Sequence, residues 1–388
     1  MVTQPDQLSE LCAELAASGT FAFDTEFVGE DSYTPVVCLL QVATPQHCAI
    51  VDPLDRGLDV TPLWDLIADP KIEKIVHAGS EDLGLCFKQT GRPAANILDL
   101  QIFAGFVGMG YPTSLSRLVK LVTGVQLHKS QTLTDWRKRP LTREQIDYAA
   151  LDVVHLPTMS VTMRGHLVSR GRTDWATEEC EAMCRATACL PSHTQKLRKL
   201  PGMASMTKRE MAIALAILDE RDRLAIQFNR PSRVLLKDYL VVELARRGWT
   251  DVSKMQSLRG MTLNAASLQK MARAIEAGRN APLDDMPVPE DDAPDSEEDM
   301  LLSLLSMVLH DHCARIDLAS ALRATRRSRR AYVKSRRAGT NSPTTDQASL
   351  LSGWRVIAIG DLLERLLTGR SAIRITKDDG RFRLSIDA

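Results

Sequence analysis

The spacing of hydrophobic and polar residues divides the chain into regions with different secondary structure. Over roughly the first 170 residues, short β-like runs alternate with helical patterns, which is typical of a sheet with helices against it. Three β-like runs follow an amphipathic start, at residues 20–28, 36–43 and 47–51. They are close enough along the chain to form an antiparallel meander. Residues 71–78 then predict a buried strand that leads into a helix from Ser80. We therefore expect an α/β domain, a mixed sheet flanked by helices, over residues 1–170.

The periodicity becomes purely helical after this domain. Residues 171–199 are expected to form a helical connection, and residues 200–281 a small all-α domain. Thr207 and Glu210 form a capping-box signature at the start of its first long helix. The same signature, Thr142 with Gln145, opens the last helix of the α/β domain.

Charge is distributed unevenly over the rest of the chain. Residues 282–299 hold nine acidic side chains, four prolines and no basic side chain, which predicts a flexible linker. Residues 300–388 follow with a helical pattern, so another small helical domain is expected there. Within it, residues 323–337 carry eight basic side chains and no acidic one. Such a run suits either a surface that holds RNA or an ordinary solvated helix face.

Whole-chain composition narrows the class of protein. The 388 residues include 49 basic and 49 acidic side chains, so no net charge attracts nucleic acid. No stretch approaches the roughly 18 uninterrupted apolar residues of a membrane span, and no secretion signal is recognisable. Eight cysteines without disulfide-type spacing suit a reducing compartment, so a cytoplasmic protein is expected. Cys180, Cys184 and Cys189 crowd together, but buried small residues of a helix explain them better than a zinc site.

Acidic side chains at three places are the candidate chemical groups. Asp24 and Glu26 are two residues apart in the first expected strand, so both carboxylates project from one face among apolar neighbours. A bound cation would offset their repulsion and desolvation, although a solvated strand face is the simpler alternative for this pair alone. Asp82 lies where a buried strand passes into a helix, a place that acids also occupy as caps. Tyr148 and Asp152 share one helix face.

The order and spacing of these groups resemble those of one family. The matching segments are Asp24-Thr25-Glu26, Asp82 within residues 77–82, and Tyr148-x3-Asp152. They resemble the three motifs of the DEDDy exonucleases in the RNase H-like superfamily, most closely those of ribonuclease D. The resemblance extends to residues 129–141 and covers roughly residues 21–156. Thr134 replaces a serine that is usual in the family, and Pro157 stands where the family helix normally continues.

The helical regions carry a second, looser resemblance. Residues 200–281 are similar to the HRDC domain, a module that ribonuclease D shares with RecQ-type helicases. The residues that carry this similarity are Arg221-Asp222, Ala225, Asn229-Arg230-Pro231, Leu235 and Asp238-Tyr239-Leu240. Residues 300–388 look like a diverged second copy, and a lineage-specific interaction module is the alternative.

The family resemblance implies a metal-dependent 3′-to-5′ exonuclease with two divalent ions. Asp24 would bridge both ions, with Glu26 and Asp152 completing the site of the nucleophile metal. Asp82 would hold the leaving-group metal through water. Because the ligands are carboxylates without histidine or thiolate, Mg²⁺ or Mn²⁺ is expected rather than zinc. Tyr148 would orient the attacking water, since an unperturbed pKa near ~10 makes it a poor base.

The implied substrate is the 3′ end of RNA, such as a transfer RNA precursor, and no protein partner is identifiable from the sequence. The sequence shows no reader of the 2′-hydroxyl, so a Werner-type DNA exonuclease is an alternative. Another is a catalytically silent nucleic-acid-binding adaptor. The presence of all four acids and the tyrosine disfavours the adaptor.

Several residues near these motifs allow two interpretations. Lys129, Arg137 and Arg139 are possible substrate contacts, since they can bind phosphates or serve as solvated loop charges. His77 ends a buried strand and is expected to be a hydrogen-bonded structural residue rather than a base. Trp136 is expected to pack against the protein rather than to stack on bases.

Overall fold

The chain folds into two compact units. The computed structural model describes residues 1–127, 134–189, 191–284, 286, 295–323, 325–337, 339, 350, 352–378 and 381–386. Unit 1 comprises Met1–Glu26, Leu39–Ala188 and Pro294–Ala388. Unit 2 comprises Phe27–Cys38 and Cys189–Ala293. Each unit has its own cluster of buried hydrophobic side chains.

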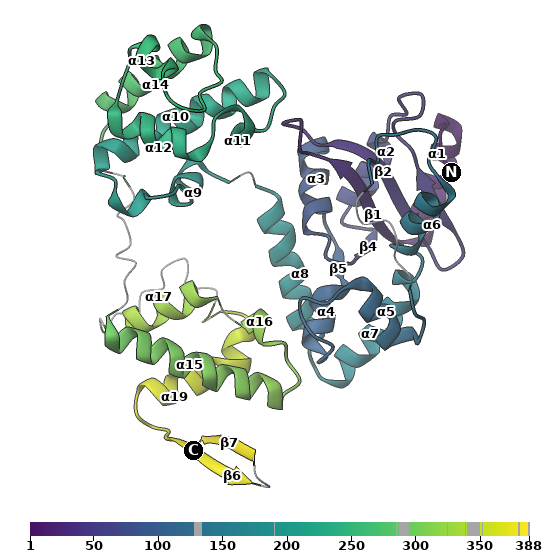
Figure 1. The fold of residues 1–388 in the computed structure, drawn as a ribbon. Coiled ribbons are helices and arrows are strands. Elements are labelled where there is room, and N and C mark those ends of the chain that lie inside the picture. The colour runs from purple at the N-terminus through teal and green to yellow at the C-terminus, as the bar shows by residue number, and fades with distance from the viewer. Residues whose placement is uncertain are drawn as a thin grey trace. The chain divides into compact units, whose positions relative to one another are not determined.

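A five-stranded mixed sheet forms the N-terminal part of the fold (Figure 1). Its strands are β1 (Thr20–Val28), β2 (Val36–Ala43), β3 (Cys48–Val51), β4 (Glu73–Val76) and β5 (Ile97–Asp99), in the order β3-β2-β1-β4-β5. The pairing of β2 with β3 is antiparallel, whereas β4 pairs parallel with both β1 and β5. The expected strands are therefore present, and the predicted mixed sheet is confirmed.

Eight helices accompany this sheet in the described part of residues 1–189. They are α1 (Pro5–Ser18), α2 (Thr61–Ala68), α3 (Ser80–Thr90), α4 (Leu100–Phe106), α5 (Leu115–Thr123), α6 (Arg143–Leu151), α7 (Leu156–Ser169) and α8 (Thr173–Thr187). Ala22 of β1 and Ile75 of β4 share a buried cluster with apolar residues of α4, α5, α7 and α8. The predicted capping box opens α6, because Thr142 and Gln145 exchange side-chain and backbone hydrogen bonds.

Unit 2 is a helical bundle around its own core. Its elements are α9 (His193–Arg198), a 3₁₀ turn (Met203–Ser205), α10 (Lys208–Gln227), α11 (Ser232–Leu235), α12 (Asp238–Arg247), α13 (Val252–Gln256) and α14 (Ala265–Asn280). The second predicted capping box, Thr207 with Glu210, opens α10. Arg221 of α10 is buried and donates hydrogen bonds to Leu236 O and Asp238 Oδ1, which ties the start of α12 to α10.

The C-terminal part of unit 1 is mostly helical. It contains α15 (Ser296–Arg315), α16 (Ser320–Arg323), α17 (Arg326–Arg337), a π-helical turn (Val356–Gly360) and α19 (Asp361–Leu367). A two-stranded antiparallel sheet of β6 (Ile373–Asp378) and β7 (Arg381–Ile386), yellow in Figure 1, follows these helices. This hairpin was not predicted.

The expected linker over residues 282–299 is wrong at its C-terminal end. Asp295 caps α15 by accepting a hydrogen bond from the Glu298 amide, so the helix begins inside the predicted linker. Glu298 is itself buried and pairs with Arg330 of α17 at 2.6 Å. The acidic residues from Asp295 to Asp299 are therefore helix-starting groups with cationic partners, which composition alone does not reveal.

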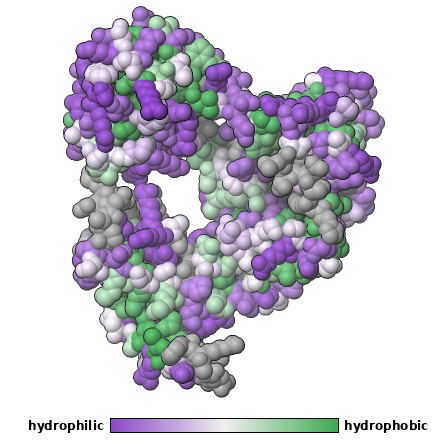
Figure 2. All heavy atoms as spheres, in the orientation of Figure 1, coloured by the Kyte–Doolittle hydropathy of each residue, from purple (hydrophilic) through white to green (hydrophobic). Residues whose placement is uncertain are grey.

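The surface of the molecule carries many hydrophilic side chains. On the face drawn in Figure 2, they cover most of unit 2, as expected for a bundle that buries its apolar positions. Within the described parts of the chain, no helix combines the length and the apolar character needed to cross a bilayer.

Candidate active site

Three of the four predicted carboxylates converge in unit 1. Asp24 and Glu26 project from β1, and Asp152 is the residue that caps the C-terminal end of α6. Each of the three offers a carboxylate oxygen, and these oxygens lie within 4.8 Å of one another. Negative charges at such separations repel, whereas a hard divalent cation prefers oxygen ligands of this kind. The donor set therefore fits Mg²⁺ or Mn²⁺.

The fourth acid, Asp82, is placed differently. It lies in the first turn of α3, is only 7% exposed, and accepts a hydrogen bond from the Thr25 hydroxyl. Burial raises the pKa of Asp82 to about 6, although the hydrogen bond from Thr25 works in the opposite direction. Asp82 is not one of the three converging groups, so its role as a ligand through water stays a prediction.

Thr25 is a site residue that the sequence analysis did not single out. It lies between Asp24 and Glu26 on β1. Its buried hydroxyl donates a hydrogen bond to Asp82. The available signal was a threonine between two acids in an apolar strand, a position where a polar side chain needs a buried partner.

Tyr148 lies near the three carboxylates. Burial raises its pKa to about 12, and the negative charges of Asp152, Glu26 and Asp24 contribute to the same shift. The phenol is therefore protonated throughout the neutral range and can donate a hydrogen bond. Its ring lies against that of Trp136, with 6.0 Å between the ring centroids. Trp136 is buried, in agreement with the expected packing role.

Contacts within the protein explain the position of Arg139, so no substrate phosphate is needed to explain it. Its guanidinium forms two hydrogen bonds of 2.6 Å with Asp52, a carboxylate that is 2% exposed at the end of β3. It also donates to Trp136 O at 2.7 Å. These contacts fix the segment that leads into α6. Among the other possible substrate contacts, Arg137 pairs with its neighbour Asp135, and Lys129 lies outside the described residues.

His77 has the structural environment that was expected for it. Its Nε2 lies 3.0 Å from Thr113 O. Gln101 also donates to Thr113 O, at 3.1 Å, so two side chains hold the same backbone carbonyl. A hydrogen-bonded position of this kind favours the structural interpretation over that of a base.

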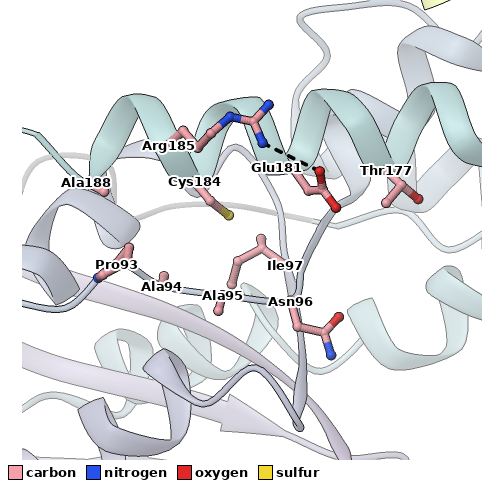
Figure 3. A pocket seen from close by; sticks show the side chains of 10 residues that line it. All are labelled: Pro93, Ala94, Ala95, Asn96, Ile97, Thr177, Glu181, Cys184, Arg185 and Ala188. Atoms are coloured by element: carbon pink, nitrogen blue, oxygen red, sulfur yellow. Dashed lines mark ion pairs between the residues drawn. The ribbon is translucent and has the colours of Figure 1, made fainter. Parts of the chain in front are cut away.

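A pocket elsewhere in unit 1 contains none of the predicted site residues. It has a volume of about 560 Å³ and lies between α8 and the chain that leads into β5 (Figure 3). Glu181 and Arg185 of α8 form an ion pair at this pocket, with 3.5 Å between the charged atoms. Burial raises the pKa of the Cys184 thiol there to about 11, so it is protonated near neutral pH and is a poor nucleophile.

The cysteine cluster has the helical explanation favoured by the sequence. Cys180 and Cys184 are residues of α8, and burial raises the pKa of both thiols. Cys189 is exposed beyond the helix. In the described parts of the chain, only Asp24, Glu26 and Asp152 form a cluster with the spacing of metal ligands.

Comparisons with known proteins identify the family to which this chain is similar. A family model described as 3′-5′ exonuclease matches residues 1–164. Ribonuclease D of Zymomonas mobilis is 30% identical over 386 residues, covering 97% of this chain and 96% of that protein. Ribonuclease D of Sphingobium indicum is 30% identical over 394 residues, covering 99% and 98%.

A solved structure extends the likeness to the fold. The crystal structure of Escherichia coli RNase D, described as an exoribonuclease involved in structured RNA processing, matches with a TM-score of 0.80. The two sequences are 27% identical, and the match covers 95% of this chain and 98% of the other. Because ribonuclease D relatives at 30% identity match over nearly the whole length of both chains, this chain belongs to the ribonuclease D family of 3′-5′ exonucleases.

Proposed function

We propose that this protein is a metal-dependent exoribonuclease that removes nucleotides one at a time from the 3′ end of RNA. The observation that carries the proposal is the convergence of the Asp24, Glu26 and Asp152 carboxylates, with oxygens within 4.8 Å of one another. Support also comes from membership of the ribonuclease D family, whose E. coli member is described as an exoribonuclease.

In this proposal the converging carboxylates hold two divalent ions, Mg²⁺ or Mn²⁺. Asp24, Glu26 and Asp152 would hold the ions, with Asp24 shared between them. Asp82, which accepts a hydrogen bond from the Thr25 hydroxyl, would serve one ion through water. Bound divalent ions supply a nucleophilic hydroxide at neutral pH and neutralise charge on the phosphate.

The proposed role of Tyr148 is to position the attacking water. Its high pKa keeps the hydroxyl protonated, so it donates a hydrogen bond and does not remove a proton. The ring is held by Trp136, whose carbonyl is in turn held by Arg139. The hydroxyl therefore comes from a side chain with little freedom to move, as a positioning role requires.

We propose a transfer RNA precursor with a 3′ extension as the natural substrate class. The two helical regions are then auxiliary modules, an HRDC domain over residues 200–281 and a diverged second copy over residues 300–388. The match with E. coli RNase D supports this assignment, because it covers 95% of the present chain.

The test uses the full chain on end-labelled RNA and on DNA of the same sequence, each with a free or a phosphate-blocked 3′ end. We expect nucleoside 5′-monophosphates from free-ended RNA in Mg²⁺ or Mn²⁺, and no product in chelator. Preferential release from DNA would favour the Werner-type alternative. Binding without release from either polymer would identify a silent adaptor.

A further inference from the structure

Another buried aspartate lies in unit 1, outside the candidate metal site. Asp99 ends β5, caps α4 and is 1% exposed. Its Oδ1 accepts hydrogen bonds from the amides of Ala78 at 3.1 Å and Gln101 at 2.7 Å, and its Oδ2 accepts one from the amide of Gly79 at 3.1 Å. Burying a carboxylate is costly, and backbone amides are the groups that offset the cost here.

The backbone that Asp99 binds has an unusual conformation. Ala78 has a φ of +59°, in the left-handed region that residues with a Cβ rarely adopt. At Gly79, an added Cβ would lie 2.7 Å from a methyl carbon of Val76, so the chain turns too tightly for any larger residue. A conformation of this kind persists only where the surroundings hold it, and the Asp99 carboxylate contacts both residues.

This tight turn leads directly into the helix that carries Asp82. Gly79 caps α3, and Asp82 is the third residue of that helix. Any shift of the turn is therefore passed to Asp82 through a rigid first helical turn. On its other side Asp82 is held by the Thr25 hydroxyl, next to Asp24 and Glu26 on β1. The position of Asp82 relative to β1 thus depends on the turn as well as on Thr25.

We propose that Asp99 is a positioning residue for the metal site: its carboxylate fixes the Ala78–Gly79 turn and so holds Asp82 at the distance from β1 that the reaction requires. This inference rests on the proposed function. Both carboxylate oxygens are needed, since Oδ1 and Oδ2 accept from different amides. An asparagine would place an N–H against one of these amides, leaving the donor without an acceptor.

The main test compares Asp99→Asn with the wild-type full chain. We expect turnover on a short RNA oligonucleotide to fall by at least tenfold and the KM for RNA to change by less than twofold. Titration of Mn²⁺ into the protein without RNA, measured by calorimetry, is expected to show metal binding weakened by at least fivefold. A variant that keeps both turnover and Mn²⁺ affinity within twofold of wild type overturns the proposal.

The matched control separates positioning from general loss of stability. Leu15 is a fully buried core residue of α1, and Leu15→Ala lowers stability without touching the turn. At a temperature where both variants are fully folded, Leu15→Ala is expected to keep wild-type Mn²⁺ affinity. An equal loss of affinity in the two variants would mean that Asp99 is only a stability residue.

Two further variants test the same turn, and the first of them keeps the inference testable if Asp99→Asn does not fold. Gly79→Ala displaces the same turn through its contact with Val76, so it should weaken Mn²⁺ binding as well. Glycine adopts the left-handed conformation of residue 78 without strain. Ala78→Gly should therefore restore part of the Mn²⁺ affinity when it is added to Asp99→Asn. Wild-type affinity in Gly79→Ala refutes the role of the turn. An inactive wild-type chain would instead refute the proposed exonuclease function, whatever Asp99 does.

Discussion

At the scale of single residues, the three converging carboxylates have opposite effects on stability and on activity. Without a cation they repel one another, and in the proposed function each would be a ligand of a bound cation. We expect Asp24→Asn or Asp152→Asn to lower turnover by at least about a hundredfold, since even outer-shell changes cost about 10–100-fold. The metal-free variants should melt at or above the wild-type temperature. Mg²⁺-dependent activity within a few fold of wild type would contradict the metal-ligand role.

Tyr148→Phe tests the hydroxyl alone, because the ring keeps its contact with Trp136. If the hydroxyl positions water, we expect turnover to fall by at least about tenfold with Mn²⁺ affinity unchanged. Since the pKa of Tyr148 is about 12, the phenol stays protonated between pH 6 and pH 9 and should add no ionisation to the rate profile in that range. A parallel loss of metal binding would make Tyr148 a support of the site instead.

Asp82 makes the stability of the metal-free protein depend on pH. Burial raises its pKa to about 6, whereas an unfolded aspartate titrates near ~3.9, so the folded state binds the proton more tightly. Protonation of Asp82 therefore stabilises the folded, metal-free protein completely below about pH 4, and this stabilisation is lost as the pH rises through about 6. Asp82→Asn keeps an acceptor for Thr25 and no charge. We expect it to stabilise the metal-free protein by about 3 kcal/mol at pH 8 and not at pH 4.

Urea denaturation in chelator at the two pH values measures this difference. The control is Asp59→Asn, since Asp59 is an exposed group that accepts hydrogen bonds from Thr61 at the start of α2. An equal gain from Asp82→Asn at pH 4 and pH 8 would show that the buried charge is not the cause.

At the scale of elements, α6 depends on a tether that lies before it in sequence. Arg139 joins the segment ahead of α6 to Asp52 at the end of β3. Because the carboxylate is buried and the guanidinium largely covered, we expect Arg139→Gln to cost about 3 kcal/mol of unfolding free energy. Turnover should fall with it, since α6 carries Tyr148 and ends at Asp152.

A double-mutant cycle with Asp52→Asn checks this tether. The two single variants should each be strongly destabilised, and the double variant should lose much less than the sum of both. Arg139→Lys keeps the charge but not the two-point geometry, so it is expected to rescue only part of the loss. Additive losses in the cycle would show that the two side chains act independently.

Elements set by local signals could be predicted from the sequence, and those set by distant partners could not. The bounds of β1 and β2 and both capping boxes follow from alternation and from contacts three residues apart. The C-terminal hairpin also has a local signal, the alternation of Ile373 and Ile375 ahead of a glycine. The partners of Thr25, Asp52 and Asp99 lie too far along the chain for periodicity to reveal.

At the scale of the whole molecule, the basic run has a different environment from the one its composition suggests. Its residues 326–337 form α17, and several arginines of this helix pair with acids at the start of α15. Arg330 pairs with Glu298, Arg326 with Asp299, and Arg337 with Asp295. Arg336 pairs with Glu364 of α19. The run therefore has an intramolecular explanation, and RNA binding by this helix stays a prediction that competes with these pairs.

The C-terminal residues of unit 1 also complete the core of the exonuclease part. Trp354 is buried, stacks on Trp175 of α8 with 5.6 Å between ring centroids, and meets Phe106 of α4 edge-on. Arg172 donates to Phe106 O and also to Asp317 O, across the same contact. Hydropathy periodicity can indicate that an apolar position is buried, but it cannot pair residues that are about 180 positions apart.

Ending the chain after Ala281 therefore tests packing as well as RNA binding. The truncation retains Asp24, Glu26 and Asp152 but removes Trp354, and with it the cover of Phe106 and Trp175. We expect a lower melting temperature and reduced hydrolysis even of a short oligonucleotide.

The full-length variant Trp354→Ala separates packing from RNA binding. It should also melt at a lower temperature, because losing a large buried side chain costs about 3–5 kcal/mol of unfolding free energy. It keeps α17, so its salt dependence of RNA binding should equal that of wild type. If α17 binds phosphates, the truncated chain alone should lose about 0.7 in log–log salt slope per phosphate contact. A truncated chain that melts like wild type would contradict the packing of the C-terminal residues against α4 and α8.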